Sequence, residues 1–426
     1  MTAAIQQNVA RLRGAGNAAA PQAALALTYI FPLRMAPGLP DYAGHRVSAF
    51  VDHNSAGGAV LDYYGGTRTY DGHRGTDYGL YPFAWNKLEA GDVQVVAAAA
   101  GTLINKVDDN PADRNCNGSS GGNWNYIALL HADGRLTIYG HLRHNSLTSK
   151  GVGAAVAQGE YLATAASSGD SSGPHLHFEV RVGSFSTNEW VDPYAGPNSQ
   201  PGSLWASQRP YYDSAINRLA THSAPPVENP CLPTTTNLQD SFTAPATIYF
   251  YAYYRDYQGG LATQFTIYRP DGSVFQTWQD VPANPGFQPT AVRSAAFAVS
   301  TLDPGGVWRF EAVYNGQAYE THFTLNGPLL AAQDDFALTA LNTAVAIDVL
   351  GNDSRPNGAA LTALGAPANG TASLVNGQVW YTPTIGFLGQ DVFTYTVGAN
   401  TDQALANVTV LVVAEVSRVY LPVIQH

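Results

Sequence analysis

Charged residues are scarce in this chain of 426 residues, because lysine, arginine, aspartate and glutamate together make up only 12% of it. That is about half their usual share in soluble domains. Lysine occurs only at Lys87, Lys106 and Lys150. The formal net charge is -11 and no run of lysine or arginine is present. These properties argue against nucleic acid or an anionic membrane surface as the partner.

Long apolar stretches are also lacking. No run of about 18 or more apolar residues occurs, so the sequence predicts no transmembrane helix. Residues 23–33 follow two arginines and could act as a weak signal peptide, but prolines bracket them and no small-residue cleavage site follows. We expect instead that a signal peptide is missing from this sequence or was removed from it.

Cysteine is nearly absent, with Cys116 and Cys231 as the only two copies. They lie far apart in the sequence and outside any C-x-x-C pair, so a metal role is not expected. Two interpretations stay open. The pair is either a disulfide that ties a loop to a linker in a secreted protein, or two unrelated free thiols.

Glycine, proline and tyrosine, in contrast, are plentiful, with 42, 26 and 24 copies. Short strand-like runs are separated by turn residues along most of the chain, for example residues 124–130 and 136–142 around a turn at residues 131–134. The sequence therefore predicts a mainly β protein, and its length suggests about three domains.

The N-terminal half divides into three parts. Residues 1–45 form a lead-in, or pro-segment, with a short helix expected at residues 3–12. Residues 46–200 contain strands and glycine turns and are expected to form one domain. Residues 201–236 are expected to contain a short helix, within residues 203–219, and then a proline-rich linker.

The C-terminal half is expected to contain two β-sandwich domains, at residues 237–327 and 331–415, because regular short strands recur there without helices between them. The strands expected in the first are residues 247–254, 263–268, 295–299, 307–314 and 319–325. Those expected in the second are residues 345–350, 377–382, 391–397 and 406–413. Residues 416–426 form an apolar tail, which is either a final strand or an export or attachment signal.

The residues that could carry chemistry concentrate before position 180. The run S-G-P-H-L-H-F-E at residues 172–179 predicts a turn followed by a strand. Alternate side chains of a strand share a face, so His175, His177 and Glu179 face one way and the residues between them face a core. Such an H-x-H is either half of a metal site on a rigid strand or a pair of exposed histidines.

Two further elements supply partners for this pair. His73 and Asp77 stand among glycines that disfavour a helix, so a turn or an irregular strand must position them. His141 lies near the end of an expected strand. One aspartate and two histidines would give a tetrahedral zinc ion three protein ligands and an open fourth position. The two remaining histidines would then suit proton transfer.

Together these elements resemble the M23 zinc metallopeptidases, the lysostaphin and LytM-like peptidoglycan endopeptidases. H-x-G-x-D at residues 73–77, Y-x-H-L at residues 139–142 and P-H-L-H-F-E at residues 174–179 occur in that family's order, within about residues 45–196. The resemblance implies an antiparallel-sheet, LytM-like peptidase domain with one catalytic Zn²⁺ and no other cofactor.

The resemblance also implies the roles of the site residues. His73, Asp77 and His177 would be the zinc ligands. His141 and His175 would be the catalytic pair that activates water and stabilises the transition state, and which of them is the general base stays open. No motif residue departs from the family's pattern.

Three other groups of residues get less specific predictions. Glu179 either supports a zinc ligand or forms a structural ion pair. His53, His131 and His144 are expected to be surface or turn residues. The polar loop at residues 108–123 does not have the spacing of an EF-hand, and we expect a surface loop that could influence substrate choice.

The unit at residues 331–415 resembles the cadherin-like and bacterial immunoglobulin-like repeats of secreted proteins. The resemblance rests on D-D at 334–335, I-D-V-L-G-N-D at 347–353, Y-T-P at 381–383, G-F at 386–387 and F-T-Y-T at 393–396. Asp334, Asp335 and Asp353 are either Ca²⁺ ligands at a domain junction or caps of strand ends, and the latter is favoured. The unit at residues 237–327 resembles immunoglobulin-like modules only in general pattern.

The sequence therefore predicts a monomeric zinc endopeptidase, secreted or on the cell surface, that hydrolyses peptide bonds in peptidoglycan. The β-sandwich domains would serve targeting or spacing. The alternatives are a non-catalytic cell-wall-binding protein or adhesin, and a peptidase acting on glycine-rich extracellular proteins. A further hypothesis is that residues 1–45 occupy the substrate groove as an inhibitory segment.

Overall fold

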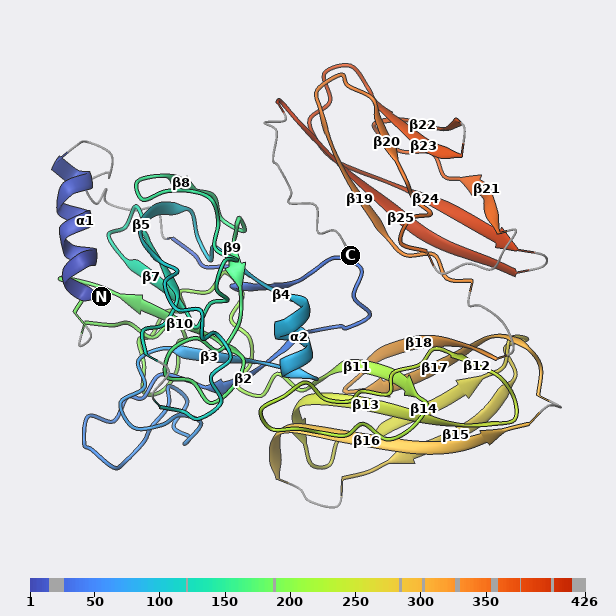
Figure 1. Cartoon of the computed structure of the whole chain (residues 1–426), viewed down its shortest axis with the longest axis horizontal. Coiled ribbons are helices and arrows are strands. Elements are labelled where there is room, and N and C mark those ends of the chain that lie inside the picture. The colour runs from blue at the N-terminus through green and yellow to red at the C-terminus, as the bar shows by residue number, and fades with distance from the viewer. Residues whose placement is uncertain are drawn as a thin grey trace.

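The computed structural model describes residues 1–14, 27–119, 122–186, 189–282, 286–300, 303–325, 330–353, 359–375, 377–399 and 402–415. Within these residues the chain is mainly antiparallel β-structure, with two helices, α1 (Thr2–Gly14) and α2 (Ala84–Ala90), as Figure 1 shows. The predicted mainly β fold is confirmed. No helix of the described ranges is long and apolar enough to cross a membrane.

The first unit contains a seven-stranded sheet, in the order β2-β3-β10-β7-β6-β5-β8, and a three-stranded sheet, in the order β1-β4-β9. Buried residues of both sheets, such as Val95 and Phe178, form one hydrophobic core. The strands are β1 (Leu33–Met35), β2 (His45–Ala49), β3 (Thr76–Leu80), β4 (Val93–Val96), β5 (Gly101–Val107), β6 (Tyr126–Leu130), β7 (Leu136–Gly140), β8 (Ala155–Val156), β9 (Tyr161–Thr164) and β10 (His175–Arg181).

The other face of the large sheet carries the histidines at one end and α1 at the other. His177 pairs directly with Gly140, and Glu179 pairs with Ile138, so these four residues share a face. α1 buries Ile5, Val9 and Leu12 in a cluster that includes Ile138. A helix was predicted at residues 3–12, and the apolar residues of this one are spaced to cover a sheet. Residues 15–26 of the proposed inhibitory segment lie outside the described residues.

The second unit is a β-sandwich of two sheets, in the orders β11-β13-β16 and β12-β18-β17-β14-β15. Its core contains buried aromatic residues from both sheets, among them Phe250 and Trp308. The strands are β11 (Ala215–His222), β12 (Ser241–Phe242), β13 (Ala246–Gln258), β14 (Thr263–Tyr268), β15 (Val274–Asp280), β16 (Phe287–Val299), β17 (Gly306–Tyr314) and β18 (Gln317–Leu325).

The helix predicted within residues 203–219 is wrong. Leu204 and Trp205 are buried in the core of the first unit, whereas Ile216 and Leu219 lie on β11 in the core of the second. The apolar spacing therefore reflects two cores and not one helical face. Because β11 pairs with β13, the second unit begins earlier than the boundary predicted at residue 237.

The first two units are joined by buried polar contacts. Arg68, in the segment before β3, forms an ion pair with Asp256 of β13 and donates to the carbonyl of Tyr211. Asn217 of β11 donates its side-chain amide to the carbonyls of His45 and Tyr81. Separating the two units would leave these buried polar groups without partners, which costs free energy. These contacts therefore hold the second unit against the first.

The third unit is also a β-sandwich, with sheets in the orders β19-β25-β24-β21 and β20-β23-β22. Figure 1 places it next to the second unit. Its strands are β19 (Asp335–Ala340), β20 (Val345–Ile347), β21 (Ala360–Leu364), β22 (Gly370–Val375), β23 (Gln378–Pro383), β24 (Gly389–Ala399) and β25 (Asp402–Val413). The tail at residues 416–426 lies outside the described residues.

Candidate metal centre and active site

Two neighbouring strands and one turn bring the predicted metal ligands together. Asp77 on β3 pairs directly with His177 on β10, so their side chains project from the same face of the sheet. His73 lies in the irregular segment before β3. All three side chains are buried, with between 2% and 8% of each residue exposed.

Three ligand atoms converge at this point. His177 Nδ1 lies 2.8 Å from Asp77 Oδ1 and 3.2 Å from His73 Nε2. His73 Nε2 and Asp77 Oδ1 are 3.1 Å apart. Among the residues that the structure describes, this is the one group of three or more that could hold a metal ion.

The hydrogen bonds around the cluster fit a bound cation. His73 Nδ1 lies 2.6 Å from the carbonyl oxygen of Phe50, so its proton sits there and Nε2 turns a lone pair towards the cluster. His177 Nε2 faces Glu179 Oε2 at 3.9 Å, which leaves Nδ1 for the metal. Two imidazole nitrogens and one carboxylate oxygen are a donor set typical of zinc.

The histidines around Asp77 keep its side chain charged. Burial alone would favour the neutral acid, but His73 and His175 hold the pKa of Asp77 well below its usual range. The side chain therefore offers a carboxylate at neutral pH. Tyr70, which stacks on the His73 ring at 4.2 Å, places its hydroxyl 3.5 Å from Asp77 Oδ2.

His141 and His175 lie beside the cluster and have their Nδ1 atoms occupied. His141 Nδ1 lies 2.6 Å from the carbonyl oxygen of Ser168, and His175 Nδ1 lies 2.8 Å from that of Gly173. His175 presents its Nε2 to the cluster, 3.7 Å from Asp77 Oδ1. The His141 ring lies 6.0 Å from the His177 ring between centroids. Burial lowers the pKa of both imidazoles, so both are neutral at pH 7.

Two glycines make room for this arrangement. A Cβ on Gly75 would lie 2.5 Å from His177 Nε2 and 2.7 Å from the Phe178 carbonyl oxygen. A Cβ on Gly140 would lie 2.2 Å from the Trp124 ring, and Trp124 packs against His141 at 4.9 Å between ring centroids. The glycine of the H-x-G-x-D element is therefore required by close packing against His177, a candidate ligand.

Glu179 has two contacts. Both of its carboxylate oxygens accept hydrogen bonds from the Arg181 guanidinium, at 2.9 and 3.0 Å, and both residues are 2% exposed. The remaining contact is with His177 Nε2. The two interpretations of Glu179 are therefore compatible, because the ion pair with Arg181 holds the carboxylate where it faces the candidate ligand His177.

The three histidines expected at surface or turn positions bond to groups outside the cluster. His53 pairs with Asp192, and His144 contacts Asp108. His131 begins the turn between β6 and β7, in agreement with the predicted surface or turn position, although its ring is buried and bonds to the Ala100 carbonyl. Within the described part of the chain, these three rings bond to groups other than the candidate ligands.

The sequence did not reveal several residues of the site, namely Phe50, Tyr70, Trp124, Ser168 and Gly173. Three of these act through backbone carbonyls, which leave no side-chain signal. Tyr70 stands three positions before His73 in the sequence. This closeness to a candidate ligand is the one sequence signal that could have placed Tyr70 in the site.

The carboxylates predicted as an alternative Ca²⁺ site lie at one end of the third unit. Asp334, Asp335 and Asp353 do not form a metal-binding group among the described residues. Tyr395 donates its hydroxyl to Asp353, and Asp334 accepts from the Asn407 backbone. The second oxygens of Asp335 and Asp353 are buried without a hydrogen-bond partner.

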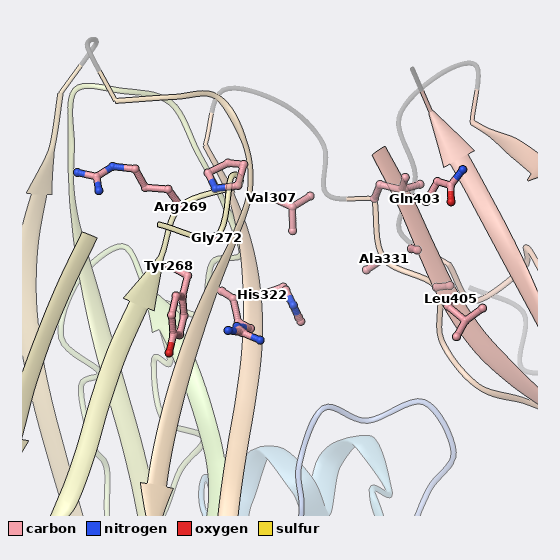
Figure 2. A pocket seen from close by; sticks show the side chains of 13 residues that line it. Tyr268, Arg269, Gly272, Val307, His322, Ala331, Gln403 and Leu405 are labelled. Atoms are coloured by element: carbon pink, nitrogen blue, oxygen red, sulfur yellow. The ribbon is translucent and has the colours of Figure 1, made fainter. Parts of the chain in front are cut away.

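A hollow of about 600 Å³ lies between the second and third units, away from the histidine cluster of the first unit. Figure 2 shows Tyr268, Arg269 and His322 on one side of it and Gln403 and Leu405 on the other. No residue of the first unit lines it, and it contains no triad of metal-ligating groups among the described residues.

Comparison with known proteins agrees with the motifs. Residues 73–193 match Peptidase family M23, and residues 326–412 match the bacterial Ig domain. The chain thus contains an M23 peptidase domain, and a bacterial Ig domain follows it, as the sequence predicted.

Two solved structures are similar to the peptidase part. The catalytic domain of lysostaphin from Staphylococcus simulans is 23% identical, covering 36% of this chain and 87% of that one, with a TM-score of 0.22. The catalytic domain of a prophage-encoded M23 protein, EnpA from Enterococcus faecalis, is 25% identical over 38% of this chain and 98% of that one, with a TM-score of 0.22. No curated protein matches the chain.

Proposed function

We propose that this chain is a secreted zinc-dependent endopeptidase that hydrolyses peptide bonds in peptidoglycan. One observation carries the proposal: His73, Asp77 and His177 converge on one point, with two further histidines, one buried and one half-buried, beside it. The match of residues 73–193 to Peptidase family M23 supports the same reaction class.

The roles proposed for the site residues follow from their contacts. His73 Nε2, Asp77 Oδ1 and His177 Nδ1 would hold the zinc ion. Bound zinc polarises a carbonyl oxygen and lowers the pKa of a coordinated water towards about 7.

His141 and His175 would move protons. Their Nδ1 protons are held by backbone carbonyls, so each neutral ring presents an Nε2 lone pair that can accept a proton from the attacking water. After accepting it, the cationic ring can donate to the leaving amine or stabilise the developing oxyanion. Each ring has its Nδ1 on a backbone carbonyl, so either histidine could be the general base and the other could stabilise the oxyanion.

The other parts of the proposal have separate support. The Cys116–Cys231 disulfide is consistent with secretion, because such bonds persist in oxidising compartments. The buried contacts of Arg68 and Asn217 hold the second unit rigidly to the peptidase unit, which suits a spacer. The bacterial Ig domain suits a targeting module. A monomer is the proposed state.

Digestion of purified peptidoglycan tests the proposal. The intact chain and the His141→Ala variant would each be incubated with it, and the released fragments identified by mass spectrometry, with zinc measured by elemental analysis. New peptide ends that disappear in the variant are expected, and they name the cleaved bond. If peptidoglycan is unchanged although one zinc is bound, a glycine-rich protein is tested as the substrate. Cleavage of that protein would favour a peptidase of extracellular proteins. No cleavage would favour a non-catalytic wall-binding protein.

A further inference from the structure

The Cys116–Cys231 disulfide joins the peptidase unit to the linker that leads into the second unit, with its Cα atoms 5.6 Å apart. On the linker side the bond has a firm anchor. Trp85 of α2 donates its indole N–H to the Pro230 carbonyl, next to Cys231. Asn86 and Thr234 exchange two hydrogen bonds, at 2.9 and 3.1 Å.

On the other side, the disulfide holds residues 113–118, which we call the disulfide loop. This loop lies against residues 166–173, which we call the catalytic loop. Three backbone hydrogen bonds of 2.9–3.0 Å join them, from Ser167 to Asp113, from Asn115 to Ser167 and from Gly118 to Ser171. The Asn115 side chain adds a fourth, to the Gly169 carbonyl at 2.7 Å.

The catalytic loop in turn orients both non-ligand histidines. Its Ser168 carbonyl accepts the Nδ1 proton of His141, and its Gly173 carbonyl accepts that of His175. The Ser171 hydroxyl, 2.7 Å from that of Ser167, is also 3.3 Å from His175 Nδ1. The zinc-ligand candidates, in contrast, are fixed by β3, β10 and the segment before β3.

We infer that the Cys116–Cys231 disulfide is a positioning cross-link for His141 and His175, so that the peptidase becomes fully active only where this bond forms. The inference rests on the proposed function. Without the bond, the disulfide loop keeps its hydrogen bonds to the catalytic loop but loses its tie to the linker. The two carbonyls then move more freely, and the imidazoles spend less time aligned with the site.

The bond is accessible to a reductant, because Cys231 is exposed and Cys116 is half-buried. A water-soluble phosphine reduces it by donating two electrons: one water supplies the oxygen of the phosphine oxide and the two protons of the thiols. A phosphine is preferred to a dithiol because dithiols bind zinc.

The test compares the full-length wild type, oxidised and phosphine-reduced, with the double variant Cys116→Ser/Cys231→Ser. We expect kcat on peptidoglycan to fall about 10- to 100-fold in the reduced protein and in the variant, since small misplacements of catalytic groups have effects of this size. Zinc content should be unchanged and KM should change less than kcat. Amide hydrogen exchange should become faster in the catalytic loop, and reoxidation should restore the wild type.

Leu232→Ser is the matched control, because Leu232 is exposed beside Cys231 and leaves the disulfide intact. It should behave as the wild type. If the double variant does not fold, Asn115→Ala keeps the disulfide and removes two side-chain hydrogen bonds, the one to the Gly169 carbonyl and the one accepted from the Asn117 N–H. A smaller change of the same kind is expected. Wild-type kcat together with unchanged exchange in a folded, disulfide-free protein overturns the inference.

Failure of the proposed function has a different signature. If the oxidised wild type cuts no peptidoglycan, that proposal fails, while the exchange rates of the catalytic loop still report on the cross-link. Faster exchange on reduction then supports the positioning part of the inference, and unchanged exchange overturns it.

Discussion

The rings of His141 and His175 lie 4.3 Å apart between centroids, and each has its Nδ1 atom held by a carbonyl of the same loop. His141 directly follows β7, and His175 begins β10. The loop at residues 166–173 therefore orients both rings through its backbone carbonyls. The two rings therefore form a pair, separate from the three side chains that we propose as metal ligands.

This distinction predicts different losses in two variants. His141→Ala should lower kcat at least about 100-fold, the usual contribution of a general acid or base, while zinc stays bound. His177→Ala should lose the zinc itself, because it removes one of three ligand atoms. Elemental analysis and peptidoglycan digestion measure the two effects, and zinc loss in His141→Ala would contradict the assignment.

Removal of the metal should abolish cleavage reversibly. Treatment with 1,10-phenanthroline is expected to stop peptidoglycan digestion, and added Zn²⁺ should restore it. A ligand that binds only the folded state raises the melting temperature, so Zn²⁺ should stabilise the metal-free chain but not its Asp77→Asn variant. Persistent activity in a chain shown to be free of metal argues against zinc chemistry.

Gly75→Ala tests the packing of the H-x-G-x-D element. The new Cβ would meet the His177 ring and the Phe178 carbonyl at distances under 3.0 Å, so the ligand must shift. We expect zinc affinity to fall about 10- to 100-fold, as for other changes that misplace a ligand, measured by competition with a chelator. Gly151→Ala is the control, since no atom lies within 4 Å of its Cβ position.

Glu179→Ala should destabilise the peptidase unit. It leaves the Arg181 guanidinium buried at 2% exposure without its carboxylate, and breaking a buried pair in this way costs about 3–5 kcal/mol. Urea unfolding followed by intrinsic fluorescence gives the free energy, and zinc titration shows whether His177 has lost support. A midpoint equal to that of the wild type would falsify this role.

The third unit should lose stability as the pH rises through neutrality. Burial, reinforced by the carboxylates of Asp353 and Asp334, raises the pKa of Asp335 to about 7. The folded unit therefore binds a proton more tightly than the unfolded chain between about pH 4 and pH 7, and its stability falls over that interval.

Scanning calorimetry of the full chain at several pH values measures this effect. Asp335→Asn should flatten the pH dependence of the transition of the third unit, whereas Asp348→Asn, exposed on the same unit, should leave it unchanged. Added Ca²⁺ is a second test of the same carboxylates. If it raises this transition temperature in the wild type and not in Asp335→Asn, the carboxylates bind Ca²⁺, and the interpretation of these aspartates as strand caps is wrong.

The sequence by itself determined the mainly β fold and the chemistry-bearing elements. Alternation at residues 175–179 is local, so it predicted the strand and showed that His175 and His177 share a face. Histidine and aspartate at fixed spacings also carry their chemistry in the residue type, which is why the motifs alone indicated an M23 peptidase.

The tertiary structure alone decided which groups meet across long separations. Residues 203–219 have helix-like spacing, but two cores divide their apolar side chains, and pairing with β13 outweighs local propensity. The disulfide was one of two open interpretations, because sequence does not say which loops lie side by side. The carbonyls of Phe50, Ser168 and Gly173 orient three histidines through the backbone, which every residue shares, so only the folded chain shows where they point.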